Sequence, residues 1–154
     1  MGMIEERLQE LGIDLPEAAA PAANYVPFVI SGNLVFISGQ VPVVGGELKY
    51  RGKVGQDYTL EEAKECAELV AINILSVLRQ ACDGELDRVK RCVKLGGFVN
   101  SVPEFDQQPQ VINGASDLMV QVFGEVGRHA RFAVSSNSLP FDVAVEIDAI
   151  FEIG

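Results

Sequence analysis

Hydrophobic and polar residues alternate with different periods along the chain, and each change of period marks an expected element. Residues 143–153 alternate strictly, with Val145 and Ile147 on one face and Glu146 and Asp148 on the other. A period of two predicts a strand with one buried face. Shorter apolar runs between turn residues predict further strands at residues 25–30, 34–38, 41–44, 47–50, 89–99 and 129–134.

Three segments have the period of a helix instead. Residues 60–81 carry apolar side chains at helical spacing, and Thr59 with Glu62 three residues later forms a capping-box pattern before them. A second helix is expected at residues 109–123, followed by Gly124, and a short one at residues 3–11. Gly96-Gly97 predicts a bulge or a close backbone approach inside the strand at 89–99.

Two helices packed on one face of a mixed sheet give an α+β fold. We expect residues 1–154 to form one domain, with residues 1–15 as an N-terminal helical extension. The second face of the sheet would carry Glu146, Asp148 and Ile150, which is too apolar for open water and too polar for a core. The pattern therefore predicts an assembly that covers this face.

Composition removes several classes of function. The 154 residues include 12 basic and 22 acidic side chains, a net charge of −10, which disfavours nucleic acid as a partner. No apolar run reaches the ~20 residues of a membrane span, so no membrane contact is expected. Residues 1–15 lack the basic start and apolar stretch of a signal peptide, and we expect a cytoplasmic location.

The reactive residue types are few. Cys66, Cys82 and Cys92 show no CxxC spacing and are expected to be buried thiols rather than nucleophiles. His129 is the one histidine, and the acidic residues show no metal-loop spacing. We therefore expect no metal, and neither pair of glycines forms a phosphate-binding loop.

Arg131 and Glu146 are the candidate functional residues. If residues 139–142 form a turn, a hairpin of the last two strands would bring the two side chains together. The planar fork of arginine matches a carboxylate, and a nearby glutamate could hold a water, which suggests a site for a small carboxylic acid. The alternative is a cross-strand surface pair worth less than about 1 kcal/mol.

Two ordered motifs add a resemblance to a known family. Residues 32–42 read GNLVFISGQVP, and the C-terminal part has AR at 130–131, LP at 139–140 and VEIDAI at 145–150. Both motifs, and the spacing of Arg131 to Glu146 (146 − 131 = 15), resemble the signatures of the RidA/YjgF family of enamine/imine deaminases. That family often carries the label endoribonuclease L-PSP, and the similarity spans about residues 22–153.

The resemblance implies a fold and an activity. Members have a chorismate-mutase-like fold, in which a curved mixed sheet is backed by two helices. Three subunits close their sheets into a central barrel, with a site in each inter-subunit cleft. Members that carry the arginine hydrolyse reactive 2-imino and 2-enamino acids, released by pyridoxal-phosphate enzymes, to 2-keto acids and ammonia without a cofactor.

The resemblance also implies site residues. Arg131 would bind the substrate carboxylate, and Glu146 would position the attacking water near the imine carbon. Phe132 and Ala133, after the arginine, would border the pocket. The remaining residues expected to line it are Tyr25, Ser38, Gly39 and Asn113.

Departures from the family pattern indicate a divergent subgroup. Phe132 stands where the family usually has a small residue, and Ala133 where it often has cysteine. These changes leave a binding protein or sensor, which holds a small carboxylate without turnover, as an alternative to the hydrolase. A ribonuclease is the third reading, and the net charge and the lack of a histidine pair or metal carboxylates argue against it.

Overall fold

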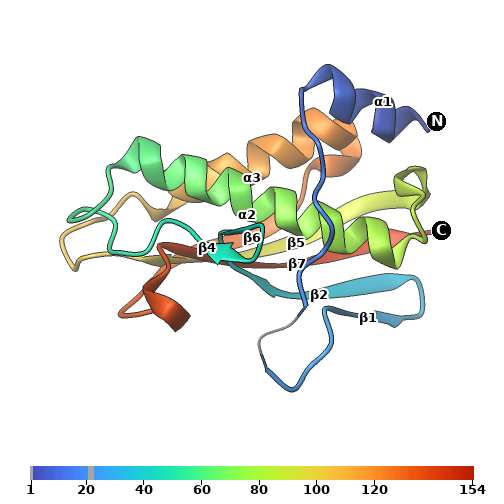
Figure 1. Cartoon of the computed structure of the whole chain (residues 1–154). Coiled ribbons are helices and arrows are strands. Elements are labelled where there is room, and N and C mark those ends of the chain that lie inside the picture. The colour runs from blue at the N-terminus through green and yellow to red at the C-terminus, as the bar shows by residue number, and fades with distance from the viewer. Residues whose placement is uncertain (1, 21–22) are drawn as a thin grey trace.

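The computed structural model describes residues 2–20 and 23–154, and its centre is one mixed five-stranded sheet. Two long helices cover one face of this curved sheet, and no described helix covers the other face (Figure 1). The strand order is β1-β2-β7-β5-β6. The strands are β1 (Phe28–Ser31), β2 (Leu34–Gln40), β5 (Val89–Asn100), β6 (Ala130–Ser136) and β7 (Val145–Ile153).

The remaining elements are three helices, a small hairpin and three 3-10 turns. The α+β class with two helices backing a mixed sheet is confirmed, and the assignment of residues 1–154 to one domain stays a prediction. The elements are α1 (Met3–Glu10), α2 (Leu60–Ala81), α3 (Gln108–Phe123), β3 (Val43–Val44), β4 (Glu47–Leu48), η1 (Leu86–Arg88), η2 (Gly124–Gly127) and η3 (Pro140–Asp142).

The capping box starts α2 as the sequence predicts. The Glu62 amide donates to Thr59 Oγ1 at 3.2 Å, and the Thr59 amide donates to Glu62 Oε1 at 2.9 Å. The inward stripe of this helix then packs into the core, including Val70, Ile74 and Leu78. Among the described helices, α2 included, none is long and apolar enough to cross a membrane.

The expected hairpin of the last two strands is wrong. β6 pairs in parallel with β5, and β7 pairs antiparallel with β5 on its other side. The helix α3 connects β5 to β6, and such a crossover returns the chain parallel to the strand it left. The chain from 137 to 144 then passes β5 to reach β7, so Arg131 and Glu146 are separated by a whole strand.

Gly96 allows a close side-chain approach rather than a bulge. The pairing of β5 with β7 shifts register before Lys94 and runs regularly past Gly96 and Gly97. A Cβ atom at residue 96 would collide with the Asp148 carboxylate and lie 2.7 Å from the Phe132 ring. The glycine therefore leaves room on the open face of the sheet for two neighbouring side chains.

The open face of the sheet exposes several large apolar side chains. Val29 on β1 and Phe36 on β2 are paired neighbours and are 53% and 41% exposed. Phe36 also pairs with Ile150 on β7, and Val134 at the far edge is 43% exposed. Val29, Phe36 and Ile150 thus form an apolar row across three strands that ends at Lys94. Exposed apolar side chains of this kind are typical of a surface that another chain covers.

The N-terminal segment is fixed to the body at both ends. The amides of Met3 and Ile4 donate to the Asp87 carboxylate at 3.0 and 2.9 Å, which lowers the pKa of that carboxyl. Farther along, Arg79 Nη2 donates to the carbonyl of Leu15 at 3.3 Å. The connector after α1 thus runs across α2 on its way to β1 (Figure 1).

The three cysteines are free and buried, as expected from the sequence. Burial raises the pKa of Cys66 and of Cys92 to about 12, and it also raises the pKa of Cys82. Because the thiolate is the nucleophilic form, the neutral thiols of these residues are structural.

Asn100, fully buried at the end of β5, joins three segments of the chain. Its side-chain amide donates to Asp142 Oδ1 and to the Val143 carbonyl, both at 3.1 Å, and Lys53 Nζ donates to its Oδ1 at 2.8 Å. This network holds η3 against the end of the sheet.

We predict that Asn100→Ala destabilises the protein by about 2–3 kcal/mol, because buried hydrogen-bonding groups lose their partner. Chemical denaturation measures the change. Asn137→Ala, which removes an exposed amide, should change the unfolding free energy by less than about 0.5 kcal/mol. Equal stability of the two variants would contradict the role of the network.

Candidate functional site

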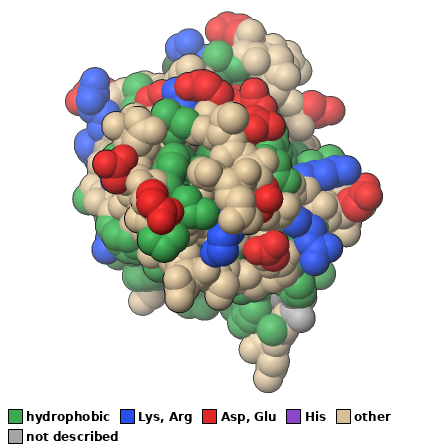
Figure 2. Space-filling model, turned by 90° about the vertical axis from the view of Figure 1, so that its left-hand side faces the viewer, with side chains coloured by type: hydrophobic (Ala, Val, Ile, Leu, Met, Phe, Trp, Pro, Cys, Tyr) green, Lys and Arg blue, Asp and Glu red, His purple; other side chains and the backbone are tan. Residues whose placement is uncertain are grey.

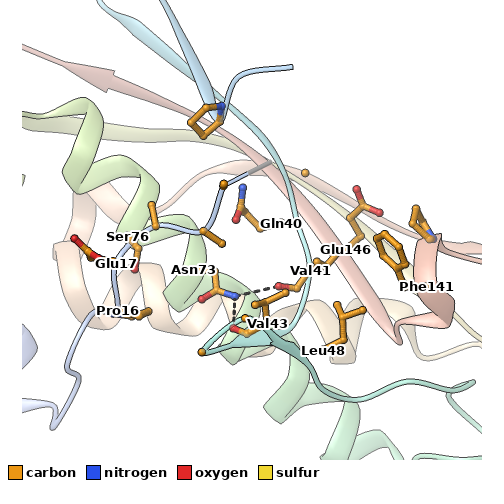
Figure 3. A pocket seen from close by; sticks show the side chains of 18 of the residues that line it. Pro16, Glu17, Gln40, Val41, Val43, Leu48, Asn73, Ser76, Phe141 and Glu146 are labelled. Atoms are coloured by element: carbon orange, nitrogen blue, oxygen red, sulfur yellow. Dashed lines mark hydrogen bonds between the residues drawn. The ribbon is translucent and has the colours of Figure 1, made fainter. Parts of the chain in front are cut away.

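A cavity of about 640 Å³ opens beside Glu146, between the end of β2, α2 and η3 (Figure 3). Most of its lining is apolar, and among the described residues no Lys or Arg lines it. The lining residues are Pro16, Glu17, Ala18, Ala19, Ala20, Tyr25, Pro27, Gly39, Gln40, Val41, Val43, Gly45, Gly46, Leu48, Asn73, Ser76, Pro140, Phe141 and Glu146.

Glu146 is partly buried on the open face of β7. Burial raises the pKa of its carboxyl above the ordinary value, and the charge of Asp148 two residues on adds to the shift. A carboxylate with a raised pKa is a stronger base, which suits it to accept a proton from water.

Gly39 makes room for the Glu146 carboxylate. The pairing of β2 with β7 shifts between Ile37 and Gln40, so residues 38 and 39 form a bulge. A Cβ atom at residue 39 would collide with the Glu146 side-chain oxygen, so any larger residue would displace the carboxylate from its present position. Gly39 thus lies in the cavity wall, and its role at a substrate site stays a prediction.

Ser38 and Tyr25 lie at the same end of β2. Ser38 Oγ donates to the carbonyl of Val26 at 2.7 Å, which holds the segment before β1. Tyr25 is in that segment rather than in a strand, because β1 begins only at Phe28, and it is 49% exposed at the cavity rim. Three predicted residues, Tyr25, Gly39 and Glu146, thus line one cavity, and Ser38 supports it.

Arg131 lies elsewhere, between β6 and α3. Its guanidinium donates to Asn113 Oδ1 at 2.9 Å, to Ser116 Oγ at 3.0 Å and to the Pro109 carbonyl at 3.0 Å. Partial burial lowers the pKa of Arg131. In the described part of the chain no carboxylate lies within ion-pair distance of it, and the nearby charge of Asp117 only partly offsets the burial. Neutral acceptors therefore orient the guanidinium.

Ser116 and His129 extend this cluster. His129 Nδ1 lies 2.6 Å from the Gly127 carbonyl and therefore carries the proton, so Nε2 accepts from Ser116 Oγ at 2.8 Å. Ser116 Oγ then accepts from Arg131. Sequence reasoning predicted Asn113 as a site residue but missed Ser116, although a spacing of three residues places both on one helix face.

Phe132 and Ala133 point to opposite sides of β6. Phe132 is on the open face, edge-on to Phe98 with ring centroids 5.2 Å apart and with Lys94 Nζ 5.5 Å from its ring centre. Ala133 packs against the core. Neither lines the cavity beside Glu146, and their roles at a substrate site stay predictions.

Within one chain, Arg131 and Glu146 do not meet. Glu146 pairs with Phe98, which pairs with Val134, so Arg131 is two strands away and three residues along. Strand geometry gives a Cα separation of ~14 Å, and the side chains leave opposite faces of the sheet. The Glu146 cavity adjoins the β1–β2 side, whereas Arg131 lies on the edge strand β6.

Other residues in the cavity wall carried no sequence signal. Asn73 on α2 donates to the carbonyls of Val41 and Val43, both at 3.0 Å, and so fixes the β3–β4 hairpin against the helix. Phe141 adopts a positive φ of 59° in η3 and lies at the opening. Such contacts depend on long-range packing and leave no local pattern in the chain.

The fold and these residues define a class of protein. A family model described as "YjgF/chorismate mutase-like, putative endoribonuclease" matches residues 5–152. The chain therefore belongs to this family, the RidA/YjgF family that its two motifs indicated. The chorismate-mutase-like fold is confirmed with it.

Relatives match almost the whole chain. Protein TCP17 of Trypanosoma cruzi is 52% identical over 99% of this chain and 95% of its own length. Atu1372 of Agrobacterium tumefaciens, of unknown function, is 54% identical with a TM-score of 0.92, covering 98% of this chain and 92% of that one. A "putative endoribonuclease" of Shewanella oneidensis MR-1 is 37% identical with a TM-score of 0.95, covering 99% and 100%.

The described residues offer no metal centre. No group of three or more His, Cys, Asp or Glu side chains within residues 2–20 and 23–154 is placed to hold an ion. Figure 2 shows acidic and basic side chains interspersed on one face, with apolar ones between them, and no continuous basic stripe there.

We predict a pH-dependent stability from His129. Burial lowers its folded-state pKa below the ordinary 6.5, so its contribution is full above pH 6.5 and is lost as pH falls through the folded-state value. Between pH 7.5 and 5.5 the wild type should lose up to about 1 kcal/mol more unfolding free energy than His129→Gln, since solvent partly screens the ring.

Chemical denaturation at the two pH values measures both proteins. The glutamine variant keeps an uncharged acceptor near Ser116, and acidic groups such as Asp87 titrate equally in both proteins. Identical pH dependence in wild type and variant would show that His129 does not titrate as described.

Proposed function

We propose that the protein hydrolyses 2-imino and 2-enamino acids to 2-keto acids and ammonia, in a cleft shared by two copies of the chain. One observation carries the proposal: the cavity beside Glu146 has no cation in its described lining, and the partly buried Arg131 has no carboxylate within ion-pair distance in the described chain, the charge of Asp117 acting on it only from farther away. An anionic substrate held at Glu146 needs the arginine, and the arginine needs an anion.

A ring of copies would bring the two halves together. The cavity adjoins the β1–β2 side of the sheet and Arg131 lies at the β6 edge, so joining the β6 edge of one copy to the β1–β2 side of the next would place them in one cleft. Closure would also cover the apolar side chains of the open face, including Phe36 and Val134. The family resemblance favours three copies, and a cytoplasmic location belongs to the same proposal.

Arg131 would bind the substrate carboxylate. Asn113, Ser116 and Pro109 already orient the guanidinium through neutral acceptors, so little ordering is left for the moment of binding. The charge is partly desolvated, which strengthens an interaction with an incoming anion. The arginine of one copy would thus fix the substrate so that its imine carbon lies near Glu146 of the next.

Glu146 would then activate water. It accepts one proton as the water oxygen attacks C2 of the iminium, which gives a carbinolamine. It returns that proton to the nitrogen, and the C–N bond breaks so that ammonia leaves. Glu146, again a carboxylate, takes the hydroxyl proton as the carbonyl forms, and passes it to the ammonia or to solvent. An iminium is already electrophilic, so water placement and charge stabilisation can supply much of the rate.

A carboxylate-binding protein without turnover is the alternative, since Arg131 and the cavity would suffice for binding alone. The word endoribonuclease in the family description names a third activity. The net charge of −10 disfavours it, and the ring of the single histidine is engaged by Ser116 and Gly127.

We predict that Arg131→Ala lowers kcat/KM for imine hydrolysis by at least about 100-fold, because a charge-assisted bidentate pair is lost. Arg131→Lys should also be impaired, since an ammonium lacks the planar fork. Keto-acid release from 2-aminoacrylate, generated by a serine dehydratase, measures the activity. Arg128→Ala, which removes an exposed charge three residues away, is the control, and activity of Arg131→Ala at the level of that control would refute the site.

Glu146→Gln should lower kcat by about 100-fold and leave binding of a stable 2-keto acid unchanged or tighter, because a negative charge is removed. The wild-type kcat should fall with decreasing pH through a pKa above the ordinary glutamate value, and this limb should be absent in the variant. Glu152→Gln, on the same face of β7, is the matched control. Equal losses of kcat and binding would make Glu146 a structural residue.

A further inference from the structure

The cavity beside Glu146 extends far beyond the space that a small imino acid needs. Figure 3 shows Glu146 and Phe141 at one end and Pro16 and Ser76 at the other, with Gln40 and Val41 between them. Its volume of about 640 Å³ lies in the range that encloses drug-sized ligands. A substrate with two or three carbons would leave most of this space to water.

The wall beyond Glu146 presents few free polar groups. Side chains of Val41, Val43 and Leu48 line the inner part. The amide of Asn73 donates to two backbone carbonyls of the hairpin, and Ser76 Oγ donates to the carbonyl of Ile72 at 3.2 Å. These polar atoms hold the wall together, as does Gln40, whose Nε2 donates to the Ser38 carbonyl at 3.0 Å. Apart from Glu17 beside Ser76 at the far end, an occupant meets a mostly apolar surface.

The outer wall of the cavity is held in place. The connector from Pro16 to Ala20 forms it, and Arg79 Nη2 donates to the carbonyls of Leu15 and Pro16 at 3.3 and 3.4 Å. At the opposite end of the N-terminal segment, the Asp87 carboxylate accepts hydrogen bonds from the amides of Met3 and Ile4 at the start of α1. Because the start of the outer wall is already held against α2, less ordering of that part of the wall is needed when a ligand binds.

From these observations we infer that the substrates carry a bulky apolar substituent on C2. The class comprises the 2-imino acids derived from leucine, phenylalanine and similar amino acids, rather than those from alanine or serine. The inference rests on the proposed function: the carboxylate meets Arg131 of a neighbouring copy, the imine carbon lies at Glu146, and the substituent fills the chamber toward Val43 and Ser76. The chain that precedes β1 thereby helps to set the substrate's size.

The test compares imines of different size. An L-amino acid oxidase generates them in place from leucine, phenylalanine or alanine, and keto-acid release is followed with and without the protein. Each buried methylene contributes a factor of about four, so the leucine-derived imine should exceed the alanine-derived one by at least about tenfold in kcat/KM.

Two neighbouring residues of β3 supply matched variants. Val43 lines the cavity, whereas Val44 is 48% exposed and does not line it. Val43→Trp should lower kcat/KM for the leucine-derived imine by more than tenfold and spare the alanine-derived one, and Val44→Trp should change neither. Leu48→Phe is a milder change on the paired strand and should also lower the preference for the leucine-derived imine. It provides the test if Val43→Trp does not fold.

The outcomes separate this inference from the proposed function. Turnover without a preference for the large imine, or a preference that both cavity variants leave intact, overturns the inference and leaves the deaminase. If no imine is hydrolysed, calorimetry with the 2-keto acids of leucine and alanine decides. Tighter binding of the leucine-derived acid that Val43→Trp abolishes then supports the chamber without the reaction, and equal or absent binding overturns it.

Discussion

The parallel pairing of β5 with β6 decides where the candidate chemistry lies. Because α3 returns the chain alongside β5, β6 becomes an edge strand and β7 takes the other side of β5. Arg131 is thereby placed beside α3, and Glu146 faces away on the open surface two strands distant. Among the described residues, the same pairing leaves Arg131 without a carboxylate at ion-pair distance at one edge, and a cavity lined by no Lys or Arg near the other.

Segments far apart in the sequence form the cavity by packing on one helix. Asn73 on α2 holds the β3–β4 hairpin through two backbone carbonyls, and Arg79 on the same helix holds the connector after α1. Asn100 keeps η3 at the opening through its bonds to Asp142 and Val143. These polar side chains hydrogen-bond the segments that surround the cavity and hold them in place. The cavity itself is therefore lined mostly by apolar side chains.

Local signals in the sequence predicted local structure well. The capping box and helical period gave α2, and the alternation after Val143 gave the two faces of β7. The pairing of the final strands was predicted wrongly, because adjacency in sequence favours a hairpin and only the packing of α3 inserts β5 between them. Ser116 and Asn73 were missed, since an isolated polar residue on a helix acquires its role from a partner that the sequence does not reveal.

The central claim is that each site takes Arg131 from one copy and Glu146 from another, and mixing two inactive variants tests it most directly. Arg131→Ala and Glu146→Gln chains, produced together in equal amounts, should assemble at random. About a quarter of the clefts would then combine an intact arginine with an intact glutamate, so about a quarter of wild-type deaminase activity should return. A mixture as inactive as either variant alone, with mixed assemblies verified by mass, would contradict the shared site.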